Sequence, residues 1–208
     1  MEKSSLAVSM QAVRAACDRV AQQIEGEGKY AHTSHLAVQI AGSLTYDRHF
    51  TGPELADVYS VTKTVLATLV GVAQRERRMP PLDDPVSDVL SELRGTPAAA
   101  HSWRHLLTMS RGSQTDGPWD IDEIVALPSG QVSHMAQAPQ LTPPGAVFRY
   151  DNASAHLISA GLQEVVGSAV ADYAERVGRS GSRIMNGSPI ERASPSAMRT
   201  SSSAPMAY

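Results

Sequence analysis

Residues 58–73 read VYSVTKTVLATLVGVA, and this stretch decides the fold of the chain. Apolar side chains recur at every fourth position from Val61 to Ala73, which predicts a helix that runs through a core. A lysine inside such a helix needs an explanation. Lys63 follows Ser60 by three residues, so both side chains share one helical face. At this distance an amine can take the proton of a serine hydroxyl and prepare a nucleophile.

The serine and lysine also have a simpler interpretation. Ser60 could cap the helix, and Lys63 could extend along the apolar surface to water. A second motif, Tyr150-Asp151-Asn152, lies where a short extended run over residues 146–150 meets a helical pattern. A phenol and an amide at this junction could project into one cleft. Taken alone, Tyr150 could equally be a core aromatic and Asn152 a helix N-cap.

Together the two motifs resemble those of the serine β-lactamase and penicillin-binding protein superfamily. The Tyr-x-Asn motif is typical of the branch with class C β-lactamases, related esterases and 6-aminohexanoate-dimer hydrolases. Further family phrases follow in order, namely PLDDPV at 81–86, WRHLLTMS at 103–110 and PPG at 143–145. The resemblance implies an α+β (α/β) fold of the β-lactamase/transpeptidase type, with an incomplete antiparallel sheet, flanking helices and a helical subdomain.

The resemblance also implies a reaction. Ser60 would attack a carbonyl, Lys63 would take its proton, and Tyr150 would pass a proton to the leaving group. Asn152 would hold the substrate and the lysine, and water would hydrolyse the acyl-enzyme. The expected partner is a small ester, amide or β-lactam substrate. We expect no cofactor and no metal, because the sequence has neither an HExxH motif nor a Cys/His cluster.

Periodicity organises the rest of the chain. Apolar residues at intervals of three or four predict an opening helix over residues 6–24, and alternation between His35 and Phe50 predicts paired strands. Prolines break residues 82–140 into short helices and loops. Helical patterns follow from Asn152 and from Val170. We therefore expect a partial hydrolase domain over residues 1–177, with a helical and loop cap at about 80–140.

Residues 178–208 have a different character. They are rich in serine, arginine and proline and keep no sustained period, which predicts an aberrant, disordered tail. The family's third motif, KTG or HxG on a late strand, is missing, and no lysine follows Lys63. That strand supplies a wall of the cleft and an oxyanion amide. We therefore expect a truncated or frame-shifted chain with an impaired site.

Charge and composition exclude some functions. A net charge of −3 gives no basic field for a phosphate backbone, so we expect no nucleic-acid partner. The N-terminal residues lack a long apolar segment, and Cys17 is the single cysteine, which predicts a cytoplasmic protein without a membrane span. The sequence leaves the oligomeric state and the actual substrate open. Two alternatives remain: a non-catalytic remnant or binding domain of the same fold, and a helical structural protein with accidental motifs.

Overall fold

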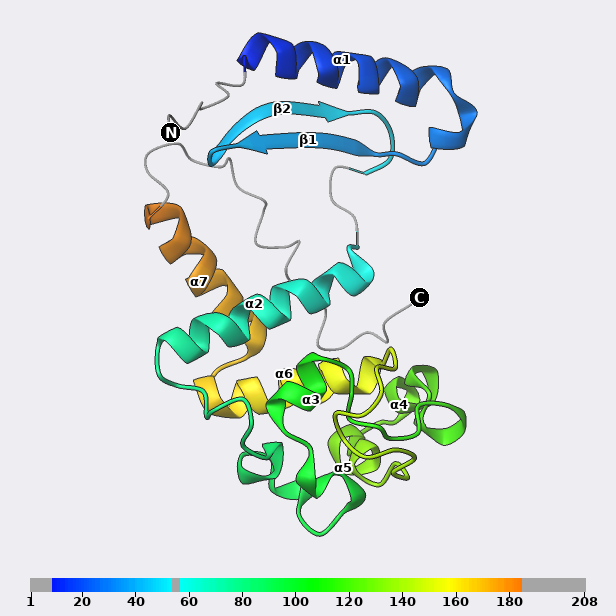
Figure 1. Cartoon of the computed structure of the whole chain (residues 1–208), viewed down its shortest axis with the longest axis vertical. Helices are drawn as coiled ribbons and strands as arrows, with labels where there is room; N and C mark the ends of the chain where they lie inside the picture. The colour runs from blue at the N-terminus through cyan, green and yellow to red at the C-terminus, as the bar shows by residue number, and fades with distance from the viewer. Residues whose placement is uncertain (1–8, 54–56, 185–208) are drawn as a thin grey trace, which may run out of the picture. The chain divides into compact units, whose positions relative to one another are not determined.

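A computed structural model describes residues 9–53 and 57–184 (Figure 1). The chain divides into two compact units, Met1–Asp57 (unit 1) and Val58–Tyr208 (unit 2). Each unit has its own secondary structure and is described by itself.

Unit 1 consists of a helix and a hairpin. Helix α1 spans Met10–Gly26, and Ser9 caps it by accepting a hydrogen bond from the backbone N–H of Ala12. The short 3₁₀ turn η1 (Gly28–Tyr30) leads into strand β1 (His35–Ile40), which pairs antiparallel with strand β2 (Ser43–His49). Helix α1 packs against β2. The opening helix and the strand pair are thus confirmed, although the predicted first turn before Ser9 lies outside the described residues.

The hairpin turn explains the pairing of the strands. Ile40 pairs with Ser43, so the loop consists of Ala41 and Gly42 alone. Both residues have positive φ angles, 49° and 81°, as a two-residue turn that matches the twist of the strands requires. Glycine adopts this conformation without strain, whereas alanine does so at a cost.

Unit 2 is helical. The 3₁₀ turn η2 (Tyr59–Val61) precedes helix α2 (Thr62–Arg75), and the long helices α6 (Asn152–Val166) and α7 (Val170–Ile184) close the described part of the unit. Short elements lie between α2 and α6: η3 (Val86–Asp88), η4 (Ser91–Leu93), η5 (Pro97–Ala100), α3 (Trp103–Leu107), η6 (Gly117–Trp119), α4 (Ile121–Ala126) and α5 (Gln131–Ala136). Residues 82–140 therefore contain short helices and loops, as the prolines predicted.

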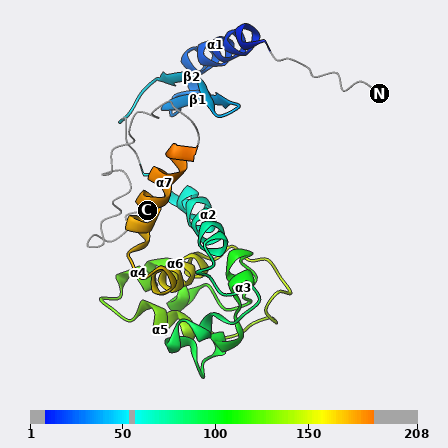
Figure 2. The same cartoon turned by 90° about the vertical axis from the view of Figure 1, so that its left-hand side faces the viewer.

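Helix α6 lies at the centre of unit 2. It contacts α2, α3, α5 and α7, as both views show (Figures 1 and 2). The indole of Trp103 is fully buried against it, and Gly161 makes this possible, because a Cβ at Gly161 would lie 2.4 Å from an atom of the indole ring. The other large buried side chains of this core include Leu93, Leu106, Ile124, Met135, Leu157, Leu162 and Tyr173.

Two predictions need correction. Residues 146–150 form no strand; they are a loop whose backbone makes a single hydrogen bond to the segment after α3, from Arg149 N–H to the carbonyl of Met109. A buried salt bridge and a helix cap, rather than a sheet, hold the end of this loop. At the other end of the unit, α7 continues past Val177 to Ile184, so the predicted disordered tail begins as a helix. The remainder of that tail, residues 185–208, lies outside the described residues.

Candidate active site

Ser60 is presented by a tight turn. It lies in η2, after Tyr59, whose φ of 43° is in the left-handed region that side-chain-bearing residues rarely adopt. The N-cap position of α2 is Val61, and no side chain caps this helix. The interpretation of Ser60 as a helix cap is therefore wrong, and its hydroxyl is available for other partners.

The hydroxyl of Ser60 meets two of the predicted residues. Lys63 Nζ lies 3.2 Å from Ser60 Oγ and donates a hydrogen bond to it. Tyr150 OH lies 2.7 Å from the same oxygen, although ninety residues separate the two in the chain. Nζ of Lys63 also lies 5.2 Å from the centroid of the Tyr150 ring. The amine is thus directed at the hydroxyl rather than at bulk water, and an amine, a hydroxyl and a phenol form one hydrogen-bonded group.

The environment of Tyr150 favours its ionised form. Its interaction with Lys63, and next its hydrogen bond with Ser60, lower the pKa of the Tyr150 phenol below its ordinary value, although burial acts in the opposite direction. The side chain is 51% exposed, so solvent reaches the group directly. A phenol that ionises more readily than usual can accept and return a proton, and an amine neighbour can supply one.

Asn152 does not join this group. It is the first residue of α6, and its side-chain amide makes no hydrogen bond to any of the described residues. The N-cap position of α6 belongs to Asp151, which accepts a hydrogen bond from the backbone N–H of Ala153 at 2.9 Å. The simple interpretation of Asn152 as the N-cap is therefore wrong by one residue.

Sequence reasoning missed a buried ion pair beside the site. Asp151 is 4% exposed and forms a salt bridge with Arg111, which is 2% exposed. Nε of Arg111 contacts one carboxylate oxygen, and Nη2 lies 3.4 Å from the other. An aspartate directly before a helical pattern is a typical N-cap, which was the available signal for Asp151. Arg111 gave no signal, because it follows α3 in an irregular segment.

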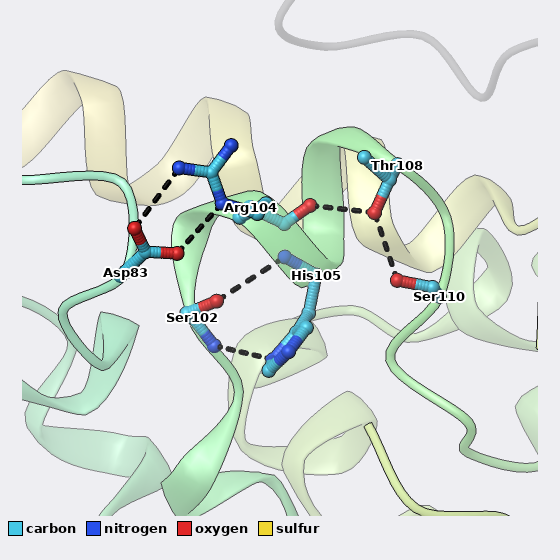
Figure 3. Close-up of polar contacts among 6 residues, drawn as sticks. All are labelled: Asp83, Ser102, Arg104, His105, Thr108 and Ser110. Carbon is cyan, nitrogen blue, oxygen red and sulfur yellow. Dashed lines mark hydrogen bonds and ion pairs between the residues drawn. The ribbon is translucent and has the colours of Figure 1, made fainter. Parts of the chain in front are cut away.

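The segment that leads to Arg111 is fixed by contacts of α3 (Figure 3). Arg104 forms a two-pronged pair with Asp83, with contacts of 2.6 and 2.9 Å. Ser102 and His105 make a reciprocal capping box at the start of the helix. After its end, the hydroxyl of Thr108 donates to the carbonyl of Arg104, at 2.8 Å, and contacts the hydroxyl of Ser110. The phrase at 103–110 is therefore structural here.

An apolar pocket adjoins the lysine. It has a volume of about 40 Å³ and lies between α2, α3 and α6, with Lys63 as its only charged lining residue among those described. Seven apolar residues complete the lining: Leu66, Ala67, Leu106, Leu107, Met109, Ala155 and Ile158. Residues 9–53 and 57–184 contain no group of three or more potential metal ligands. No helix in these ranges is long and apolar enough to cross a membrane.

Comparison with known proteins identifies the family. A family model described as Beta-lactamase matches residues 25–181. The chain belongs to the beta-lactamase family. Its fold is of the β-lactamase/transpeptidase type, as the sequence predicted, and hydrolase activity is the general property of this family. No curated protein matches the chain significantly.

Solved structures with the same fold are distant in sequence. A class C beta-lactamase in complex with cefoxitin matches with a TM-score of 0.62 and 23% identity, over 81% of this chain and 49% of that one. A penicillin-binding protein homologue from Caulobacter crescentus matches with a TM-score of 0.61 and 20% identity, over 77% and 46%. EstCE1, a hydrolase with promiscuous acyltransferase activity, matches with a TM-score of 0.59 and 21% identity, over 80% of this chain and 50% of that one. This beta-lactamase family member thus spans about half the length of these structures, and the likeness concerns the fold alone.

Proposed function

We propose that this chain is a serine acyl hydrolase that forms an acyl-enzyme at Ser60. The observation that carries the proposal is the hydrogen-bonded group of Ser60, Lys63 and Tyr150, with 3.2 and 2.7 Å contacts to the serine oxygen. A nucleophile with a base within hydrogen-bonding distance, and a second proton carrier beside it, is the arrangement that covalent catalysis requires.

The reaction would move one proton around the group. Lys63 accepts the proton of Ser60 as the serine oxygen bonds to the substrate carbonyl carbon. The protonated amine passes a proton to the Tyr150 phenolate, and the phenol delivers it to the leaving atom as the old bond breaks. Water then attacks the acyl carbon, the bond to the serine oxygen breaks, and a proton from the water returns to that oxygen as the acyl group leaves as a carboxylic acid. The lowered pKa of Tyr150 suits this shuttle, because its phenolate form is more accessible than usual.

The proposed substrates are small esters, amides or β-lactams. The family membership, the acyltransferase activity named for EstCE1 and the cefoxitin complex of the class C beta-lactamase support this class. Asn152, two residues after Tyr150 and the first residue of α6, is proposed to contact the substrate, since its amide has no partner among the described residues.

Covalent labelling of Ser60 tests the proposal. The purified full chain would be treated with a fluorophosphonate and, separately, with a penicillin, and its intact mass would be measured. We expect one adduct, which Ser60→Ala abolishes and the matched control Ser91→Ala, at an exposed serine of η4, retains. If wild type gives no adduct with either reagent, the chain is a binding or non-catalytic domain of this fold.

The role of each proton carrier can be separated by rate. Lys63→Met removes the base and should slow adduct formation about 10²–10⁴-fold, the usual range for loss of general acid–base catalysis. Tyr150→Phe should slow it as well. Tyr59→Phe is the matched control, because Tyr59 is also next to the site, is 64% exposed, and its hydroxyl makes no hydrogen bond to a described residue. Equal effects of the two Tyr→Phe changes would argue against a proton relay.

A further inference from the structure

We propose that Arg111 and Asp151 are positioning residues, a buried ion pair that fixes the Tyr150 phenol against Ser60. The expected effect on the rate of Ser60 acylation rests on the proposed function. The expected effect on the position of the Tyr150 phenol does not. Neither residue touches the reacting atoms, so their effect must pass through the start of α6.

The backbone at Asp151 links the buried and the exposed side chains. Asp151 has an extended conformation, with φ −148° and ψ 110°, in which successive side chains point to opposite sides. The carboxylate of Asp151 is 4% exposed, and the preceding phenol of Tyr150 is 51% exposed. Fixing the carboxylate inside therefore directs the phenol outward, toward the hydroxyl of Ser60.

The carboxylate of Asp151 is held on every side. Nε and Nη2 of Arg111 each face a different carboxylate oxygen. The backbone N–H of Ala153 donates to Oδ1 at 2.9 Å, and the hydroxyl of Ser154 donates to Oδ2 at 2.6 Å. The two oxygens thus have partners from α6 and from Arg111, which leaves the carboxylate no other orientation of equal quality.

Arg111 is anchored in turn through its backbone. The side-chain amide of Gln140 donates to the carbonyls of Arg111 and Thr142, both at 2.6 Å. His101 is fully buried, and its Nε2 lies 2.9 Å from the amide oxygen of the same Gln140. The arginine therefore connects two segments, residues 109–111 and residues 140–142, with the first turn of α6.

The segment next to Arg111 also binds the loop that carries Tyr150. The carbonyl of Met109 accepts a hydrogen bond from Arg149 N–H at 2.9 Å, and the carbonyl of Ser110 accepts one from Gly145 N–H at 2.7 Å. The loop before Tyr150 and the helix after it are thus both tied to residues 109–111. A shift of Arg111 would displace the phenol from both sides.

A positioning role of Arg111 and Asp151 can be distinguished from a purely stabilising one by comparing single and double replacements of the pair. Loss of one member of a buried ion pair leaves an unpaired buried charge and destabilises a protein, whereas neutral replacement of both members is often tolerated. A double neutral variant, Arg111→Met with Asp151→Asn, should therefore fold about as well as wild type. It keeps a capping residue at position 151, because asparagine is also a good N-cap. It loses the two-pronged contact that orients the start of α6, and the hydroxyl of Ser154 faces an amide donor in place of the second carboxylate oxygen.

The experiment measures where the phenol lies and how fast Ser60 reacts. Tyr150 ionisation would be followed by carbon NMR of labelled tyrosine rings in the full chain, with Tyr150→Phe to assign the signal, and Ser60 acylation by the release of nitrophenol from nitrophenyl acetate. The matched control is Arg48→Met with Glu25→Gln, an exposed arginine–carboxylate pair within unit 1. In the double variant of Arg111 and Asp151 we expect the Tyr150 titration to return toward that of a free phenol and acylation to slow about 10–100-fold, as a displaced group does. The control should change neither.

Each outcome decides the inference. A folded double variant with unchanged Tyr150 titration would overturn it. If the double variant does not fold, Arg111→Lys replaces it, since lysine keeps the charge but not the two-pronged contact; an unchanged titration there would equally overturn the inference. If wild type shows no acylation, the proposed function fails, but the tyrosine titration still tests whether the ion pair positions the phenol.

Discussion

The two units of the chain are stabilised by different means. Within residues 9–53, the described part of unit 1 up to the break, only Cys17, Ala21 and Thr45 are buried, so regular pairing and local turns carry much of its structure. Unit 2 has a continuous core around the fully buried Trp103, and that core holds helices α2 and α6, which begin directly after the turn with Ser60 and the loop with Tyr150. The difference teaches that the candidate site depends on packing, whereas the hairpin depends on backbone conformation.

The largest expected effect is at the centre of the core. Trp103→Ala removes a fully buried indole and should lower the free energy of unfolding by about 3–5 kcal/mol. Urea unfolding followed by circular dichroism measures this loss. Trp119→Ala, at a partly exposed tryptophan, is the matched control and should cost less. Equal losses would show that the core is not centred on Trp103.

A smaller change in stability is expected at Gly161, where α6 contacts the indole of Trp103. Its sign shows whether close packing or helix propensity dominates there. Alanine is a better helix former than glycine, yet a Cβ at Gly161 would lie 2.4 Å from the ring of Trp103. Gly161→Ala should therefore destabilise unit 2 by about 1–3 kcal/mol. The control is Gly71→Ala in α2, where nothing lies within 4 Å of the added Cβ. That change should stabilise by up to about 1 kcal/mol, and stabilisation at both positions would contradict the close packing.

The buried polar network around His101 should make the free energy of unfolding of unit 2 depend on pH. Burial, opposed in part by the hydrogen bond to Gln140, lowers the pKa of His101 below its ordinary value of 6.5. As the pH falls below about 6.5, the unfolded chain gains a proton that the folded chain resists, so the free energy of unfolding should decrease until the folded pKa is passed. His101→Gln removes this titration. Unfolding midpoints of both proteins between pH 7 and 5 should diverge; parallel curves would exclude His101 as the cause.

The smallest effect is expected in unit 1, at its turn. Ala41 has a φ of 49°, which asparagine tolerates better than alanine. Ala41→Asn should stabilise the hairpin by about 0.5–1 kcal/mol, since the strain of a left-handed residue is of that order. Hydrogen exchange of the β1 and β2 amides measures it. Ala41→Val, a β-branched control, should have the opposite sign, and equal exchange in all three proteins would show that the turn does not limit the hairpin.

The sequence predicted what depends on local periodicity. The strand pair from His35, the helix after Ser60 and the helix from Asn152 follow from spacings of two or of three to four. The same spacing put Lys63 beside Ser60. The approach of Tyr150 followed only from the family resemblance, because no local rule joins residues ninety positions apart.

The features that were missed depend on tertiary contacts. Arg111 and Asp151 are forty residues apart, and one of them lies in an irregular segment, so their pairing leaves no pattern in the sequence. The loop over residues 146–150 has an extended composition but no neighbouring strand with which to pair. Helix α7 continues to Ile184 through residues whose composition alone suggests disorder.

The separation of Ser60 and Tyr150 along the chain has a practical consequence. Their 2.7 Å contact forms only after the turn before α2 and the start of α6 have come together in the folded unit. A reagent that reacts with Ser60 only in this arrangement would form one adduct per correctly folded molecule. Titration with such a reagent would therefore give the correctly assembled fraction of a preparation, independently of its total concentration.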